Sequence, residues 1–147
     1  MACRKVNKEK YKTVKTTCKI LGITPEEALS LYSRVMEASG GDKSILNLDA
    51  LISILKKPFS TFEGKELYPT LAEKASVIFE GIARFHPFLN GNKRMAYELA
   101  DIFLRKNGYY ISAKSGEIFN LLNEVAEGKK NLKDISKWIG SHIRKYY

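Results

Sequence analysis

The apolar residues of this chain recur mainly at intervals of three and four, which is typical of amphipathic helices with one buried face. The clearest helix start is at Thr24, where proline follows in the first position and Glu27 can complete a capping box. This helix is expected to stop at Gly40-Gly41. Further helices are predicted at about 48–57 (capped by Asn47 or Ser44), 71–85 (capped by Thr70), 115–126 and 131–144, and another is expected to end at Asn107-Gly108. The pattern predicts an all-α fold.

Two stretches do not follow the helical pattern. In Phe59–Pro69 the aromatic residues surround Glu63-Gly64-Lys65-Glu66, a turn-like centre, which fits a hairpin-like flap or a surface loop. Tyr109-Tyr110-Ile111 has the composition of a short strand. Upstream, residues 8–20 are expected to form a short basic helix that ends before Gly22.

A chain of 147 residues suffices for one domain with a core that needs neither disulfides nor a structural metal. We expect a basic N-terminal extension at residues 1–20 followed by a single domain at 21–147. No stretch is apolar enough to cross a bilayer, and the N-terminus lacks the apolar region of a secretory signal. Cys3 and Cys18 form no paired metal-binding pattern, so a reducing, cytoplasmic location is expected.

The net charge of +9 is concentrated at the two ends of the chain, with +6 in residues 1–20 and +5 in residues 129–147. Basic ends on a nearly neutral body indicate an acidic partner or RNA-rich surroundings; an ordinary solvated surface explains them equally well. No nucleic-acid-binding module accompanies the charge, so we do not expect a nucleic-acid partner, and we expect no membrane partner.

The densest chemistry lies in His86-Pro87-Phe88-Leu89-Asn90-Gly91-Asn92-Lys93-Arg94, between two predicted buried helices. His86 precedes proline, which favours an extended backbone and a side chain that projects into a cleft. With an ordinary pKa near ~6.5, histidine can act as a general base at neutral pH. A lone histidine beside apolar residues is more often structural, but the residues that follow this one favour a functional role.

Those residues suit an anion at the start of the next helix. Asn90 could cap that helix or offer an oxygen to Mg²⁺, and Gly91 lets a ligand approach the backbone closely. Asn92, Lys93 and Arg94 offer backbone and side-chain donors to phosphate oxygens. The alternative is an ordinary capped helix with a basic first turn. Cations are unfavourable there by about 0.3–1 kcal/mol unless an anion is present.

The nine residues resemble the signature of the Fic/Doc proteins, His-x-Phe-x-(Asp/Glu)-(Gly/Ala)-Asn-(Gly/Lys)-Arg. Lys93 stands where Fic adenylyltransferases have glycine, which is similar to the Doc (death-on-curing) branch. The resemblance extends over about residues 23–143. Further segments similar to Doc-like toxins are Leu67-Tyr68-Pro69-Thr70-Leu71, Lys74-Ala75, Phe103-Leu104 and Asn107-Gly108-Tyr109.

The resemblance implies an all-helical bundle with the motif loop between its two central helices, and a magnesium-dependent transfer from ATP to a protein hydroxyl. It implies that His86 is the base, that Asn92 and the helix start hold phosphate, and that Arg94 neutralises charge. Residue 90 would help to hold Mg²⁺. Doc-type proteins transfer the terminal phosphate to a translation elongation factor and are neutralised by an antitoxin, commonly through an acidic segment. Fic enzymes transfer the nucleotide monophosphate (AMPylation).

Departures from the signature keep other functions open. Asn90 replaces the usual acidic residue, Tyr97 stands where Fic enzymes have a second arginine, and Glu98 lies nearby without an assigned role. The prediction is a Doc-like toxin with kinase activity on a Ser or Thr hydroxyl. Fic-type adenylyltransfer is the alternative reaction, and a non-catalytic nucleotide- or partner-binding domain is the alternative of another class.

Overall fold

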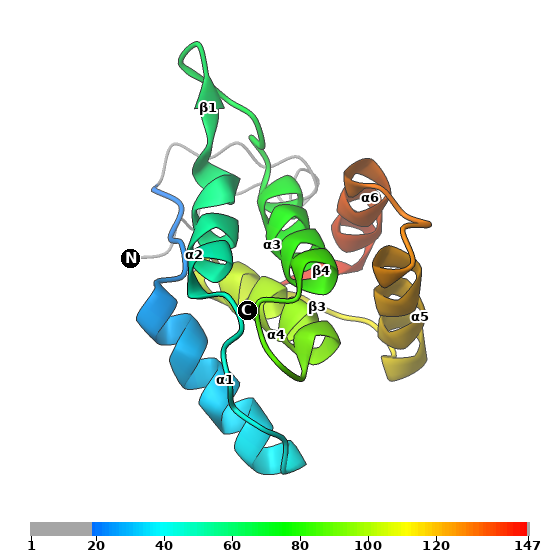
Figure 1. Ribbon diagram of the computed structural model, residues 1–147. Coiled ribbons are helices and arrows are strands. Elements are labelled where there is room, and N and C mark those ends of the chain that lie inside the picture. Colours follow the sequence, from blue (N-terminus) through cyan, green and yellow to red (C-terminus); the bar gives the residue numbers. More distant parts are fainter. Residues whose placement is uncertain (1–18, 147) are drawn as a thin grey trace.

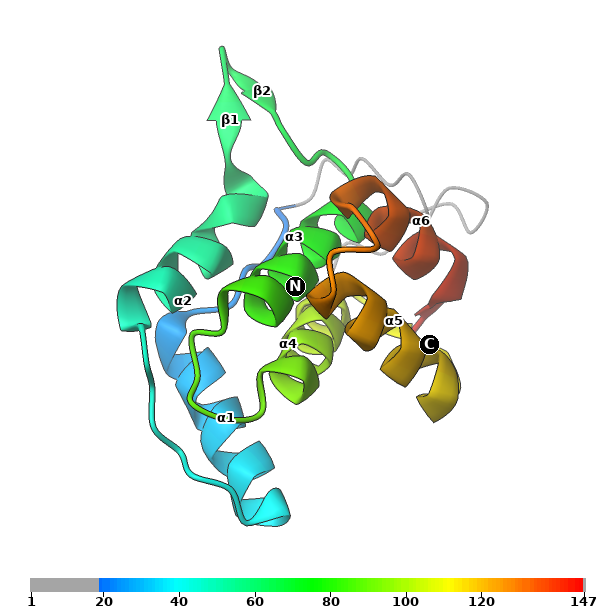
Figure 2. The same ribbon diagram turned by 45° about the vertical axis from the view of Figure 1, so that its right-hand side comes forward.

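The computed structural model describes residues 19–146, and Figures 1 and 2 show it from two sides. The prediction of a basic helix at residues 8–20 therefore falls almost entirely outside the described residues; Lys19 and Ile20 are not helical. The all-α prediction is confirmed. The helices of the described part are α1 (Pro25–Ser39), α2 (Leu48–Lys56), α3 (Leu71–Phe85), α4 (Asn92–Lys106), α5 (Ser115–Ala126) and α6 (Leu132–His142), with a 3₁₀ turn η2 (Lys57–Phe59).

Local sequence signals account for most of the helix boundaries. Thr24 forms the predicted capping box with Glu27, and Gly40 ends α1 in a left-handed conformation. Asn47, rather than Ser44, caps α2 by accepting a hydrogen bond from the Ala50 N–H. None of the helices in the described part is long and apolar enough to cross a membrane.

The helices α3 and α4 form the centre of the molecule, with α1 and α2 on one side of them and α5 and α6 on the other (Figures 1 and 2). Almost every residue of α3 is buried, from Leu71 to Ala83, which is expected of a helix surrounded by other helices. Gly81 permits the close approach of α2, because a Cβ there would lie 2.8 Å from the Ile54 side chain.

The predicted strand at Tyr109–Ile111 is present as β3, and its partner is the chain's C-terminal segment. The sequence pattern extended the last helix to Arg144, and this was wrong by two residues. The helix ends at His142, and β4 (Ile143–Lys145) pairs antiparallel with β3, with Ile111 opposite Ile143. Both isoleucines are buried, so an extended backbone places Ile143 in the core while its peptide groups bond to β3.

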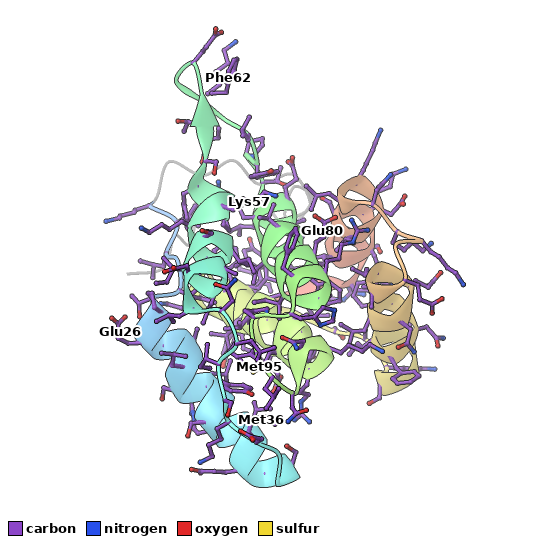
Figure 3. The ribbon with its side chains drawn as sticks, in the orientation of Figure 1. Glu26, Met36, Lys57, Phe62, Glu80 and Met95 are labelled. Carbon is purple, nitrogen blue, oxygen red and sulfur yellow. The ribbon has the colours of Figure 1, made fainter. Side chains whose placement is uncertain are left out.

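The stretch Phe59–Pro69 forms a hairpin of β1 (Thr61–Phe62) and β2 (Lys65–Glu66). Its turn uses positive φ angles at Glu63 and Gly64, which is the conformation of a tight two-residue hairpin turn. The hairpin projects from the body of the protein, and the Phe62 side chain at its end is 66% exposed (Figure 3). It precedes the N-terminal end of α3, whereas the His86 motif follows the C-terminal end.

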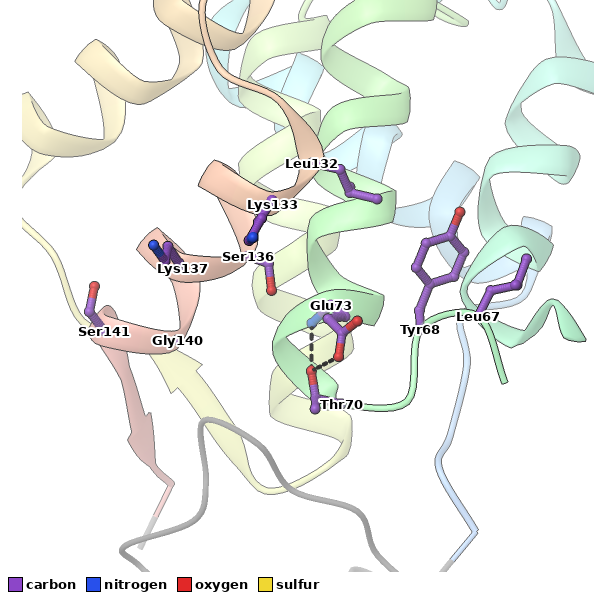
Figure 4. Close-up of a pocket in the computed structure, with 10 residues that line it drawn as sticks. All are labelled: Leu67, Tyr68, Thr70, Glu73, Leu132, Lys133, Ser136, Lys137, Gly140 and Ser141. Carbon is purple, nitrogen blue, oxygen red and sulfur yellow. Dashed lines mark hydrogen bonds between the residues drawn. The ribbon is translucent and has the colours of Figure 1, made fainter. Parts of the chain in front are cut away.

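A buried lysine fixes the base of this hairpin. Lys74, in the first turns of α3, is 1% exposed, and its Nζ donates to the Pro58 and Tyr68 carbonyls at 3.0 and 2.7 Å. It also pairs with a Glu66 carboxylate oxygen at 2.8 Å. Next to the base of the hairpin there is a groove of about 790 Å³. It lies between Leu67, Tyr68 and Thr70, which follow the hairpin, and the residues of α6 (Figure 4).

Candidate active site

The nine-residue motif connects the C-terminal end of α3 to the N-terminal end of α4, as predicted. The loop is therefore anchored by the two central helices, which carry most of the buried residues around it. The segments that pack around it come from α1, from the residues between α1 and α2, and from α5.

His86 is exposed and occupies the position that ends α3. Its backbone is left-handed, with φ +47° and ψ +60°, and its N–H donates to the Ile82 carbonyl. The expectation of an extended backbone before proline was wrong, because the end of the helix imposes a left-handed closing turn. This conformation costs a non-glycine residue free energy, and such residues are concentrated at functional sites. It leaves the imidazole outside the core.

Phe88 and Asn92 hold the loop in shape. Phe88 is completely buried, and its ring stacks on that of Tyr32 with the ring centres 4.1 Å apart. The Asn92 side chain accepts a hydrogen bond from the Phe88 N–H at 3.0 Å and donates to the Phe88 carbonyl at 2.8 Å. Because the oxygen and the nitrogen of this side-chain amide are both bonded within the loop, the group that Asn92 offers to a phosphate is its backbone N–H.

The helix α4 begins without a side-chain cap. Gly91 is the N-cap residue, with φ +79°, and a Cβ there would lie 2.9 Å from the Met36 sulfur; Figure 3 shows where Met36 lies on α1. Asn90, which was expected as a possible cap, does not cap the helix, and its side chain is exposed. The first intrahelical bond runs from the Met95 N–H to the Gly91 carbonyl, so the preceding N–H groups have no acceptor within the helix.

Two cations stand in this uncapped first turn, which contains no acidic residue. The Lys93 ammonium donates to the side-chain oxygen of Asn123 on α5 at 2.8 Å. Arg94 is 61% exposed and lies 3.7 Å from a Glu98 carboxylate oxygen, one turn further along α4. The helix dipole and both side chains therefore give this end of α4 an excess of positive charge.

Residues 42–47, between α1 and α2, lie directly against the motif, and the sequence pattern did not indicate this. The Leu89 N–H donates to the Ser44 carbonyl at 2.9 Å. The Leu46 and Asn47 N–H groups donate to the Pro87 carbonyl at 2.8 and 3.0 Å. Backbone pairing of this kind uses no particular side chain, so the sequence carries no signal for it.

Tyr32 connects α1 to this pairing. Its hydroxyl lies 3.0 Å from the Asp42 carbonyl, 3.1 Å from the Asn90 carbonyl and 3.4 Å from the Ser44 carbonyl, so it can donate to any one of the three. Burial raises the pKa of the Tyr32 phenol, which therefore stays protonated as a donor. In the sequence Tyr32 lies at helical spacing among the apolar residues after Thr24, and this periodicity gives no sign of its link to the motif.

The helix α5 is held on the opposite side of the motif by Arg84, in the last turn of α3. Its guanidinium donates to the Val125 carbonyl at 3.3 Å and to the Lys130 carbonyl. It also pairs with Glu80 at 3.2 Å. Arg84 thus ties the end of α5 to the helical turn that leads into His86.

A magnesium site of the kind implied by the resemblance fits these residues only in part. The described residues contain no group of three or more His, Cys, Asp or Glu side chains that could hold a metal. Asn90 offers one exposed amide oxygen, a weaker ligand for a hard cation than a carboxylate. Mg²⁺ is commonly bound through one or two carboxylates together with substrate phosphates and water, so the amide oxygen of Asn90 could supply one ligand of a site whose other ligands come from phosphate and water.

A loop of this sequence between two central buried helices, with a histidine at the end of the first and an uncapped, basic start of the second, defines a Fic/Doc-type site. The model of the Fic/DOC family matches residues 22–104, and the chain belongs to this family of transferases. A curated relative is Toxin Doc of Mycolicibacterium smegmatis (strain ATCC 700084 / mc(2)155). It is 33% identical over 101 residues, which cover 67% of this chain and 78% of the relative. Within the family, the chain is therefore of the Doc-like branch.

Proposed function

We propose that this protein is a Doc-type toxin that transfers the terminal phosphoryl group of ATP to a serine or threonine hydroxyl of a protein, with a translation elongation factor as the expected target. The observation that carries the proposal is the start of α4. Its first turn has no side-chain cap and no acidic residue, yet it carries Lys93 and Arg94. The exposed His86 precedes this helix in the motif. A phosphate chain would supply the missing negative charge.

In the proposed reaction, His86 accepts the proton of the target hydroxyl as its oxygen attacks the terminal phosphorus of ATP. The bond from that phosphorus to the bridging oxygen breaks, and ADP leaves with the electron pair. Lys93, Arg94 and the backbone N–H groups of the first turn of α4 stabilise the charge on the phosphate oxygens. Asn90 would hold the Mg²⁺ that accompanies ATP, and this ion would neutralise phosphate charge.

Two features support transfer of the terminal phosphate over transfer of a nucleotide. Lys93 replaces the glycine of the adenylyltransferases, and its side chain reaches across to α5. Tyr97 replaces their second arginine and is half-buried on α4; burial raises the pKa of its phenol, so it supplies no charge to the site at neutral pH.

The proposed biological role follows from the relative's name and from the charge of the chain. Toxin Doc is described as a toxin, and we propose the same role here, in the cytoplasm and under the control of an antitoxin. An acidic antitoxin segment would complement the basic ends of the chain, whose charges of +6 and +5 together exceed its net charge of +9.

Labelled ATP distinguishes the candidate reactions. A bacterial lysate is incubated with the protein and ATP labelled either at the terminal or at the α-phosphate, with His86→Ala as the matched control. We expect one protein of elongation-factor size to acquire only the terminal label, and the variant to be slower by about 10²–10⁴-fold. Label from the α-phosphate alone would replace the proposal with adenylyltransfer.

The non-catalytic alternative is tested by calorimetry with ATP in the presence and absence of Mg²⁺. It predicts binding that does not depend on the metal and no label on any protein. The proposed function predicts binding that strengthens with Mg²⁺ together with turnover.

A further inference from the structure

We propose that Asn123 on α5 is a positioning residue for Lys93 and sets where the lysine ammonium meets the phosphate chain. This inference rests on the proposed function, because it assigns Lys93 to a phosphate group. It begins from the hydrogen bond of 2.8 Å between the Lys93 ammonium and the Asn123 amide oxygen, which joins residues 30 positions apart.

The chemistry of the acceptor matters. A free lysine side chain has many rotamers, and ordering it on a ligand costs up to about 2 kcal/mol. A neutral amide oxygen holds the ammonium in one place without cancelling its charge, whereas a carboxylate would neutralise it. An ammonium has three donors, and the described contacts of Lys93 use one of them. Asn123 therefore orders Lys93 and leaves its charge and two of its donors for a phosphate.

The acceptor is itself fixed in space. Leu122 and Val125, on either side of Asn123, are buried, and the Asn123 carbonyl accepts the N–H that ends α5. Arg84 ties the C-terminal end of α5 to α3 two residues before His86. A helix that is packed on its apolar face and tied to the histidine's own helix can limit the distance between the Lys93 ammonium and the imidazole.

The first measurement needs no ATP. In NMR spectra that detect lysine side-chain ammonium groups, Asn123→Ala should shift and broaden the Lys93 signal. Asn120→Ala is the matched control, because Asn120 is exposed on the same helix, one turn earlier, and should leave that signal unchanged. A Lys93 signal that ignores Asn123→Ala overturns the proposal, whatever the protein does with ATP.

The second measurement compares the KM for ATP and the ATP affinity of the wild type with those of single and double variants at positions 93 and 123. We expect Asn123→Ala to raise the KM for ATP about three- to tenfold, the size of a lost positioning contact, while the KM for the target protein stays constant. Asn123→Asp should raise it further, since an ion pair neutralises the ammonium, and Asn123→Gln should partly restore it.

In a Lys93→Met background, Asn123→Ala should have no further effect on ATP affinity, because Asn123 acts only through the lysine. An undiminished effect in that background shows that Asn123 contacts the nucleotide itself and overturns the positioning role.

If the wild type binds ATP but labels no protein, the proposed function fails, while the ATP-binding measurements on the variants still decide the role of Asn123. If the wild type binds no ATP, both fail.

Discussion

The N-terminal ends of α3 and α4 differ in how they manage positive charge, although both carry a lysine in the first turns. At α3, Thr70 caps the helix and Glu73 is in the first turn, while Lys74 is buried with three oxygen acceptors. At α4, glycine is the cap, no carboxylate is in the first turn, and Lys93 has one neutral acceptor. The charge of Lys74 at α3 is compensated within the protein; at α4, Arg94 has the Glu98 carboxylate at 3.7 Å, but the charge of Lys93 has no carboxylate partner.

The difference separates a structural lysine from one that is available to a ligand. The acceptors of Lys74 come from the hairpin and its flanking residues, so this lysine joins three segments of the fold. The acceptor of Lys93 is a single amide on an adjacent helix, and its neighbour Arg94 is mostly solvent-exposed. Position near the start of a buried helix does not by itself distinguish the two lysines; in the sequence only the motif around Lys93 does so.

The largest expected effect is on stability when each lysine is replaced by methionine, which keeps the length of the side chain. Lys74→Met should lower the free energy of unfolding by about 3 kcal/mol, because the Pro58 and Tyr68 carbonyls lose a buried donor. Lys93→Met should change it by less than about 0.5 kcal/mol. Urea unfolding measures both, and values within 1 kcal/mol of each other would remove the contrast between the two helix ends.

A second prediction concerns the uncompensated end of α4. Inorganic phosphate should raise the Tm of the wild type by binding there, with a gain of about 1.4 kcal/mol in stability at ten times the dissociation constant. The variant with Lys93→Met and Arg94→Met should lose this gain, whereas Lys129→Met, on the surface beyond α5, should keep it. Sodium chloride at equal ionic strength separates site binding from screening. An equal gain in all three proteins would place the phosphate elsewhere.

A third prediction separates the backbone of His86 from its imidazole. Because φ is +47° there, His86→Gly should be more stable than His86→Ala by about 1 kcal/mol, since glycine adopts a left-handed conformation without strain. Both variants should lack transfer activity to the same extent. Unfolding curves and the labelled-ATP assay test this. A glycine variant no more stable than the alanine variant would show that His86 is not strained.

Sequence reasoning succeeded where the signal was local. Thr24, Asn47 and Thr70 satisfy donors within three residues of themselves, so the helix starts could be read directly from the chain. The motif loop is equally local, and its place between two buried helices was predicted correctly. The interpretation failed for His86, because a rule for isolated dipeptides was applied to a residue whose conformation is set by the end of a helix.

The rest could not be predicted because it depends on contacts between distant residues. The pairing of Ile143 with Ile111 and the bond from Lys93 to Asn123 join segments that are 30 or more positions apart. Two of the three acceptors of Lys74 are backbone carbonyls, and residues 44–47 pair with the motif through backbone carbonyls and amides. Every sequence contains these groups. Without the fold, no feature of these residues indicates a partner.

The smallest effect is expected at the start of α1, where, as at α3, a carboxylate of the protein lies in the first turn. The Glu27 carboxylate accepts hydrogen bonds from the Lys106 ammonium and from the Thr24 N–H, and these lower its pKa below the usual value. Because its pKa is lower in the folded state, the ionised Glu27 carboxylate stabilises the fold at pH values above its unfolded-state pKa. This stabilisation is lost as the pH falls through the folded-state pKa. Because the carboxylate is largely solvent-exposed, the loss should be less than about 0.5 kcal/mol, between about pH 5 and pH 3.

Glu27→Gln should remove this part of the pH dependence of stability. Glu26→Gln changes the neighbouring residue, which lies outside the capping box, and should retain it. Urea unfolding at several pH values measures the difference, and identical pH profiles for the two variants would mean that Glu27 does not compensate the charge at this helix start.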